Sequence, residues 1–169
     1  MPLAKGTRVK QFYRLVRDVT DDAYDVLLRT LVEAGGTFGL VWRDQLNASD
    51  SVLAVRSDLQ LLEVRRRRVG RWPGTQLIGH RALIITYRSE ASAFEVLRRP
   101  RSLFGWRAPD FPEDLWFTSD SGQLLLATVA HESHGWIFSK SIAKAIGQRV
   151  TLKLESRTAG DEQYFELAV

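Results

Sequence analysis

The sequence contains no cysteine, one methionine and five prolines among its 169 residues. Without cysteine, disulfides, thiolate metal sites and a cysteine nucleophile are excluded. The chain also has no apolar run near the roughly 20 residues that a membrane-spanning helix needs, and its first residues do not form the apolar stretch of a secretion signal. We therefore expect a cytoplasmic protein that has no membrane partner and no cofactor.

The rest of the composition is ordinary for a globular protein, with 44% hydrophobic and 26% charged residues. The length fits one domain built around one core. No internal repeat, low-complexity segment or linker rich in proline, glycine or serine divides the chain. The sequence therefore predicts a single domain over residues 1–169.

Local patterns predict the main helices. Thr20 precedes apolar residues at helical spacing, and two glycines end this pattern, so a helix is expected over 20–34. Two shorter helices are expected over 89–99 and from about Ser139 to Gly147. Residues 47–58 are compatible with a short capped helix.

Strands joined by short turns dominate the remaining pattern, which favours antiparallel pairing with helices packed on the sheet. The predicted class is α+β, with a mainly antiparallel twisted sheet of hairpins and about three helices. The predicted strands are 8–16 and 38–42, followed by three hairpins that pair 59–71 with 76–88, 115–118 with 123–131, and 150–156 with 163–169.

The first of these hairpins surrounds Trp72-Pro73-Gly74-Thr75, where proline followed by glycine is typical of a type II turn. A two-residue turn there places Arg66 opposite Arg81. The neighbouring pair is then Arg67 with His80. Like charges in such positions destabilise a strand pair. Either the register differs, or the hairpin projects beyond the core, or an acidic group meets the arginines.

Charge is distributed unevenly along the chain. Residues 1–60 have no net charge, residues 61–110 carry 11 arginines against four acidic residues, and residues 111–169 have a net charge of −3. The middle stretch thus has a net charge of +7, and arginine is its only basic residue type. The planar arginine fork matches carboxylate and phosphate groups. A preference for arginine codons in a GC-rich genome, or a ribbon that simply faces solvent, are the alternative explanations.

An aromatic loop follows at residues 104–112. Tryptophan, phenylalanine and arginine are enriched at the centres of protein interfaces, which makes this loop a candidate binding surface. The alternative is that the rings cover an edge of the core. The candidate partner-binding residues are Arg65, Arg66, Arg67, Arg68, Arg71, Trp72, Arg81, Phe104, Trp106, Arg107 and Phe111.

Candidates for catalysis or metal binding are few. In His131-Glu132-Ser133-His134 the histidines are three apart, not four as in the helical zinc-protease motif. His131, Glu132 and His134 remain weak candidates for a metal or hydrolase-like site. No serine-nucleophile motif occurs, and the glycines at 35–39 follow a helix and precede a strand, the reverse of a phosphate-binding loop.

Three segments carry a resemblance: Trp72-Pro73-Gly74-Thr75, Pro112-Glu113-Asp114-Leu115-Trp116-Phe117 and Thr128-Val129-Ala130-His131-Glu132. Their order and spacing resemble a group of small uncharacterised bacterial proteins, over about residues 60–135. The resemblance implies no activity. Stand-alone proteins of this size are often specialised binders, such as immunity proteins to secreted toxins.

We therefore expect a non-catalytic protein-binding module, of the inhibitor or immunity type found in bacterial defence and toxin systems. Its basic surface favours an acidic protein as the partner and argues against a basic nuclease toxin. A nucleic-acid-binding protein that uses the arginine-rich hairpin is one alternative. A hydrolase-like enzyme that uses His131, Glu132 and His134 is another.

Overall fold

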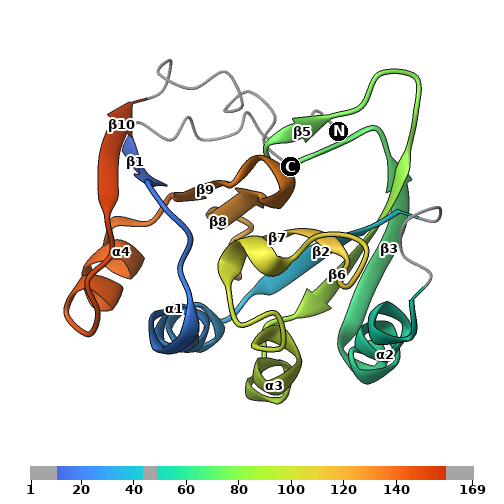
Figure 1. The fold of residues 1–169 in the computed structure, drawn as a ribbon, viewed down its shortest axis with the longest axis horizontal. Helices are drawn as coiled ribbons and strands as arrows, with labels where there is room; N and C mark the ends of the chain where they lie inside the picture. The colour runs from blue at the N-terminus through green and yellow to red at the C-terminus, as the bar shows by residue number, and fades with distance from the viewer. Residues whose placement is uncertain (1–10, 44–48, 159–169) are drawn as a thin grey trace.

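The structure is a computed structural model that describes residues 11–43 and 49–158, and these residues form an α+β fold (Figure 1). Within them, four α-helices pack on an antiparallel sheet of eight strands in the order β10-β1-β9-β8-β7-β2-β6-β3, and β4 pairs with β5 in a separate small sheet. The helices are α1 (Asp21–Glu33), α2 (Asp50–Asp58), α3 (Phe94–Leu97) and α4 (Lys140–Gly147). The strands are β1 (Gln11–Leu15), β2 (Thr37–Trp42), β3 (Glu63–Val69), β4 (Arg71–Trp72), β5 (Thr75–Gln76), β6 (Ala82–Arg88), β7 (Glu113–Thr118), β8 (Leu124–Val129), β9 (His134–Ile137) and β10 (Leu154–Thr158).

The predicted fold class is confirmed, with α2 making a fourth helix where the sequence pattern was ambiguous. Capping serines start two of the helices. The Ser49 hydroxyl accepts a hydrogen bond from the amide of Val52 at the start of α2, and Ser139 accepts one from Ile142 at the start of α4. None of the helices in the described ranges is both long and apolar enough to cross a bilayer.

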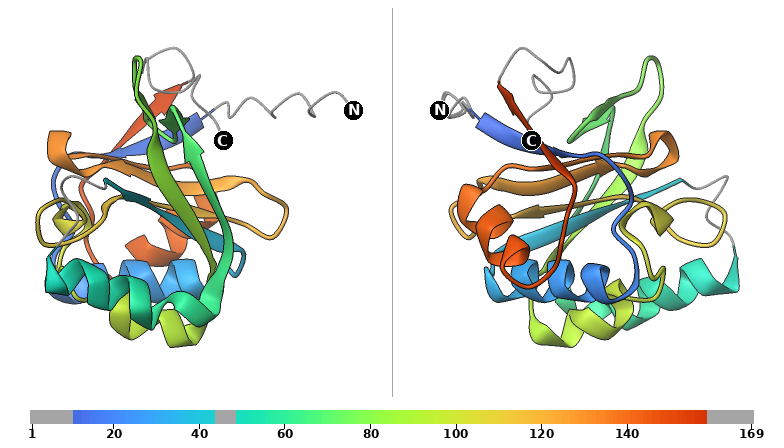
Figure 2. Two further views of the ribbon diagram at one scale, coloured as in Figure 1. Left: turned by 90° about the vertical axis from the view of Figure 1, so that its right-hand side faces the viewer. Right: turned by 60° about the vertical axis from the view of Figure 1, so that its left-hand side comes forward.

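All four helices cover the same face of the large sheet (Figures 1 and 2). The main core lies between them and the sheet. It includes Leu28 and Leu31 from α1, and the rings of Phe38, Tyr87 and Phe117 from three neighbouring strands. Phe38 lies between the other two rings, with centroid distances of 5.2 Å to Tyr87 and 5.6 Å to Phe117.

The opposite face, which we call the second face, carries a smaller apolar cluster that includes Trp72, Trp116 and Trp136. The β4–β5 hairpin folds over this face, since Trp72 belongs to the cluster and a side chain at Gly74 would touch Trp136. Gly39 leaves room for Trp116: a Cβ atom at Gly39 would lie 1.9 Å from Cζ2 of that indole. The two faces therefore have separate cores.

One predicted strand pair lies outside the described residues. The segment 163–169, predicted to pair with 150–156, is not described, and β10 pairs with β1, which is distant in sequence. β9 was not predicted as a strand, and it pairs with both β8 and β1. The sequence pattern missed these pairings because the partner strands are set by tertiary contacts.

Candidate partner-binding surface

β3 is the last strand of the sheet, and beyond its end the loop 77–81 extends past the sheet (Figures 1 and 2). We call residues 63–71 and the loop 77–81 the arginine ribbon. The ribbon closes on itself through a hydrogen bond of 2.7 Å from the Leu77 amide to the Gly70 carbonyl. The chain between these two residues forms the β4–β5 hairpin.

This arrangement corrects the predicted register. Arg66 lies opposite Ile85 and Arg67 opposite Ile84, so neither faces Arg81 or His80. The two-residue turn at Pro73-Gly74 exists, but it closes only the short β4–β5 pair, and the loop 77–81 then shifts β6 relative to β3. The predicted like-charge pairs across the hairpin are therefore absent.

The arginines of β3 alternate between the two faces of the sheet. Arg67 is opposite Ile84, whose side chain belongs to the cluster on the second face, and Arg65 is two residues away on the same side. Arg66 is on the helix-covered side, where its Nε and Nη2 atoms donate hydrogen bonds of 2.8 and 2.6 Å to the Glu63 carboxylate. Arg68, two residues further on, shares that side.

Four arginines of the ribbon are exposed or half-buried and form no side-chain ion pair or hydrogen bond with a described residue: Arg65, Arg67, Arg71 and Arg81. Arg67 is the most enclosed of the four. Partial burial lowers the pKa of its guanidinium, and the positive charge of Arg65 lowers that pKa further. Arg65 and Arg67 therefore repel each other, and neither has an ion pair with a carboxylate in the described part of the chain.

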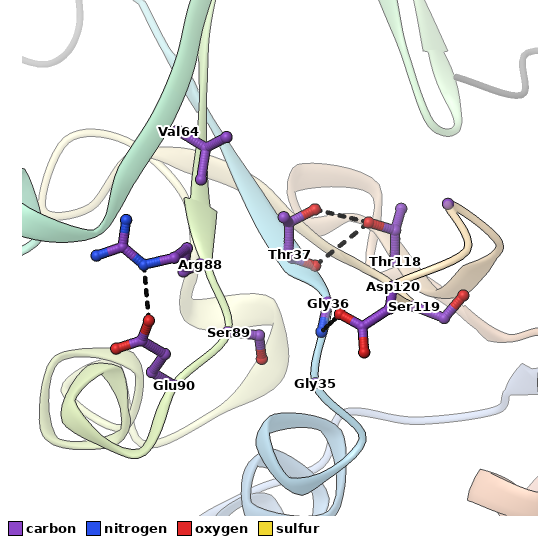
Figure 3. A pocket seen from close by; sticks show the side chains of 11 residues that line it. Gly35, Gly36, Thr37, Val64, Arg88, Ser89, Glu90, Thr118, Ser119 and Asp120 are labelled. Carbon is purple, nitrogen blue, oxygen red and sulfur yellow. Dashed lines mark hydrogen bonds and ion pairs between the residues drawn. The ribbon is translucent and has the colours of Figure 1, made fainter.

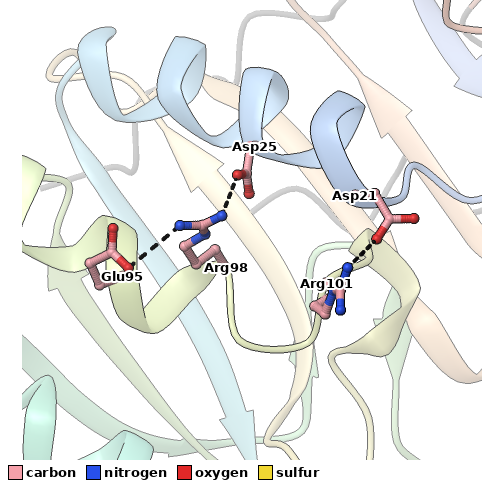
Figure 4. Close-up of polar contacts among 5 residues, drawn as sticks. All are labelled: Asp21, Asp25, Glu95, Arg98 and Arg101. Atoms are coloured by element: carbon pink, nitrogen blue, oxygen red, sulfur yellow. Dashed lines mark hydrogen bonds and ion pairs between the residues drawn. The ribbon is translucent and has the colours of Figure 1, made fainter.

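The remaining basic residues of the middle stretch behave differently, because many of them bind acidic groups of this chain (Figure 4). Arg98 bonds Asp25 of α1 at 2.6 Å, and Arg101 bonds Asp21 of the same helix at 3.0 Å. These pairs hold the α3 segment against α1. Further pairs of this kind are Arg88–Glu90 and Arg99–Asp58.

Apolar side chains are exposed along the same edge of the molecule. Ile78 is 90% exposed in the loop 77–81, Leu61 is 88% exposed just before β3, and Val64 is 56% exposed within β3. Leu53 of the adjacent helix α2 is also exposed, which leaves Val16 as the one remaining exposed large apolar residue in the described ranges. Such a grouping marks interaction surfaces more often than single exposed residues do.

The aromatic residues predicted to meet a partner are buried instead. Trp106 is 0% exposed, and its Nε1 donates a hydrogen bond of 2.7 Å to the hydroxyl of Tyr24, which donates to the Leu97 carbonyl. Phe111 is half-buried and packs edge-on against Trp106. The expectation of an exposed aromatic surface is wrong for Trp72, Phe104 and Trp106, whose rings belong to the two cores. Arg107 is exposed, but it lies beside Val16, Arg17 and Phe104, away from the ribbon.

A buried carboxylate holds the base of the ribbon in place. Asp114 is 1% exposed, and its two oxygen atoms accept hydrogen bonds from Trp72 Nε1 at 2.8 Å and from the Ala130 amide at 2.9 Å. Burial raises the pKa of Asp114 to about 6, although the two hydrogen bonds oppose this rise. The three segments of the bacterial resemblance meet here, one residue from each. With both oxygens bonded, Asp114 has a structural role, and the sequence pattern missed that role.

His131 and Glu132 lie in the short 3-10 helix Ala130–Glu132 between β8 and β9, and His134 is the first residue of β9. Glu132 lies between the two imidazoles, with Oε1 3.6 Å from Nε2 of His131 and Oε2 3.5 Å from Nδ1 of His134. Among the described residues, no three metal-ligating side chains are close enough together to hold an ion. Within the described ranges, His131, Glu132 and His134 therefore do not form a group that could hold a metal ion.

A shallow hollow of about 710 Å³ lies where the α1–β2 turn, the end of β6 and the β7–β8 turn meet (Figure 3). Its polar groups largely bind one another. Asp120 accepts a hydrogen bond from the Gly36 amide at 3.0 Å, and the hydroxyls of Thr37 and Thr118 are 2.7 Å apart. Ser89 contributes a buried hydroxyl without a partner in the described residues, and no histidine lines the hollow to activate it.

Within the described residues, the arginine ribbon with its neighbouring exposed apolar side chains is thus the surface best suited to a ligand. Comparison of the chain with protein-family models, with curated proteins and with solved structures finds no match.

Proposed function

We propose that the protein is a non-catalytic module that binds an acidic protein along the arginine ribbon, as an inhibitor or immunity protein of a bacterial toxin system does. One observation carries this proposal. Arginines without a carboxylate partner in the described chain share one edge of the molecule with four of its exposed large apolar side chains.

Charge favours an acidic partner. Arg65 and Arg67 lie on the same face two residues apart, and their mutual repulsion is relieved when carboxylates approach them. Arginine binds a carboxylate in a bidentate geometry, with two parallel N–H···O hydrogen bonds, which adds specificity to the charge attraction. An acidic surface on the partner therefore gains both energy and orientation from this ribbon.

The apolar side chains favour a protein over a nucleic acid. Leu61, Val64 and Ile78 are aliphatic, whereas single-stranded nucleic acids are held by bases stacked on aromatic rings. The tryptophans of the middle stretch are buried and offer no such stacking surface. Residues 63–71 extend over about 30 Å at roughly 3.3 Å per residue, long enough for a standard protein interface.

Affinity purification of the tagged protein from its own cells tests this proposal. The wild type is compared with R65E/R67E and with R107E/R149E, a control that makes the same charge change at exposed arginines outside the ribbon. We expect one protein to be retained by the wild type and the control and lost from R65E/R67E. Equal retention by all three, or retention of a polymer that nuclease removes, contradicts the proposal.

A further inference from the structure

We infer that the partner binds by strand addition, in which an extended segment with alternating acidic and apolar residues pairs with the outer edge of β3 and continues the sheet. This inference rests on the proposed function, because it specifies how the arginine ribbon binds a protein. It identifies the bound element as a strand and its chemistry as acidic on one face.

The backbone of β3 is available for such pairing. β3 is the last strand of the sheet, and no described residue pairs with its outer edge (Figure 2, left). In an edge strand, alternate N–H and C=O groups point away from the sheet. Solvent reaches this strand, since Val64, Arg65, Arg66 and Arg68 are all exposed. An added strand therefore hydrogen-bonds to backbone groups that pair with no other strand of the described residues.

The same edge discourages pairing between two copies of the chain. A β-bulge interrupts the register between Glu63 and Arg65, and a second β3 brings like charges against Arg65 and Arg67. An acidic strand meets opposite charges in these positions instead. The arginines thus disfavour a basic strand and favour an acidic one.

The side-chain pattern of the bound segment follows from the faces of β3. Arg65 and Arg67 are two residues apart on the second face, so the added strand has acidic residues at every second position. On the other face, Arg66 is already neutralised by Glu63, and the helix beside β3, α2, carries the exposed Leu53 (Figure 1). Apolar side chains suit the intervening positions there.

Synthetic peptides of about nine residues, long enough to cover β3, test this inference. The first peptide alternates glutamate and valine. The second replaces glutamate with lysine, and the third has the composition of the first with all its glutamates in one block. Binding at low salt is measured by calorimetry to wild type and to R65E/R67E, and backbone hydrogen exchange locates the bound peptide.

We expect the glutamate peptide to bind the wild type at least about tenfold more tightly than the other two, and to slow exchange at β3 amides. We expect R65E/R67E to bind the lysine peptide more tightly than the glutamate peptide. This binding shows that the variant is folded. No binding of the glutamate peptide, equal binding of the blocked peptide, or protection away from β3 overturns strand addition. The purification above then decides independently whether an acidic protein binds the ribbon in another way.

Discussion

The indole of Trp72 donates a buried hydrogen bond of 2.8 Å to the carboxylate of Asp114, across 42 residues of sequence. Through this bond the β4–β5 hairpin is fixed to β7, and the ribbon that carries Arg71 and Arg81 keeps its direction relative to the sheet. The Ala130 amide binds the other oxygen of Asp114. A rigid base of this kind reduces the entropy lost when a partner binds the ribbon.

Replacing Trp72 with phenylalanine removes the donor and leaves an oxygen of Asp114 buried without that partner. We expect the free energy of unfolding to fall by about 2–4 kcal/mol, the sum of an unsatisfied buried acceptor and a small cavity. Urea denaturation measures this loss of stability. Tyr13→Phe, which removes a half-buried hydroxyl, is the control and changes stability by less than about 0.5 kcal/mol. An unfolding free energy for W72F equal to that of Y13F contradicts the assigned role.

Asp114 also makes stability depend on pH. Its folded pKa of about 6 is above its ordinary value of 3.8, so the folded state binds the proton more tightly than the unfolded state. Wild type therefore gains stability relative to Asp114→Asn as pH falls from about 6 to about 4, by up to about 3 kcal/mol. Unfolding of both proteins across pH 4–7 measures this difference, and a constant difference rules out the raised pKa.

Gly39 is required by the indole of Trp116. An alanine Cβ at Gly39 overlaps this buried ring, so we expect G39A to lose more than about 3 kcal/mol of stability or not to fold. Gly147→Ala is the matched control. It adds a methyl group to α4 where no atom lies within 4 Å, and it leaves stability unchanged or slightly raised. Thermal unfolding compares G39A with G147A. Equal melting temperatures contradict the close packing of Gly39 against Trp116.

The proposed function assigns the charges of Arg65 and Arg67 to binding and not to folding. These arginines repel each other and have no ion pair with a described residue, so we expect R65Q/R67Q to be as stable as the wild type or more stable by up to about 0.5 kcal/mol. The gain shrinks as salt screens the repulsion. Urea denaturation at low and high salt measures both effects. A clear loss of stability in R65Q/R67Q shows instead that these side chains have a structural role.

The sequence predicted elements whose signals are local. Thr20, the two glycines at 35–36 and the serines at helix starts identified helices, and the turn around Asp120-Ser121-Gly122 identified the β7–β8 hairpin. These signals act within a few residues, so they are readable without the tertiary structure.

The candidate site was only partly predictable. The sequence left three explanations open for the consecutive arginines: a different register, a projecting hairpin or an acidic group that meets them. The structure shows a different register, with Arg65 to Arg68 in the edge strand β3. The burial of Trp106 depends on Tyr24, which is 82 residues away and whose hydroxyl accepts a hydrogen bond from the indole N–H. No local pattern distinguishes such a buried tryptophan from an interface tryptophan. The exposure of Ile78 likewise follows from the loop 77–81, which the assumed two-residue turn left out.

Site-specific photo-crosslinking in cells tests the central claim most directly. A benzophenone amino acid is placed at Ile78, which is 90% exposed on the ribbon, or at Lys144, which is exposed on α4. We predict one protein adduct from position 78, its loss in the R65E/R67E background, and no such adduct from position 144. Equal adducts from both positions, or an adduct at 78 that persists without the two arginines, contradicts binding of an acidic partner by the arginine ribbon.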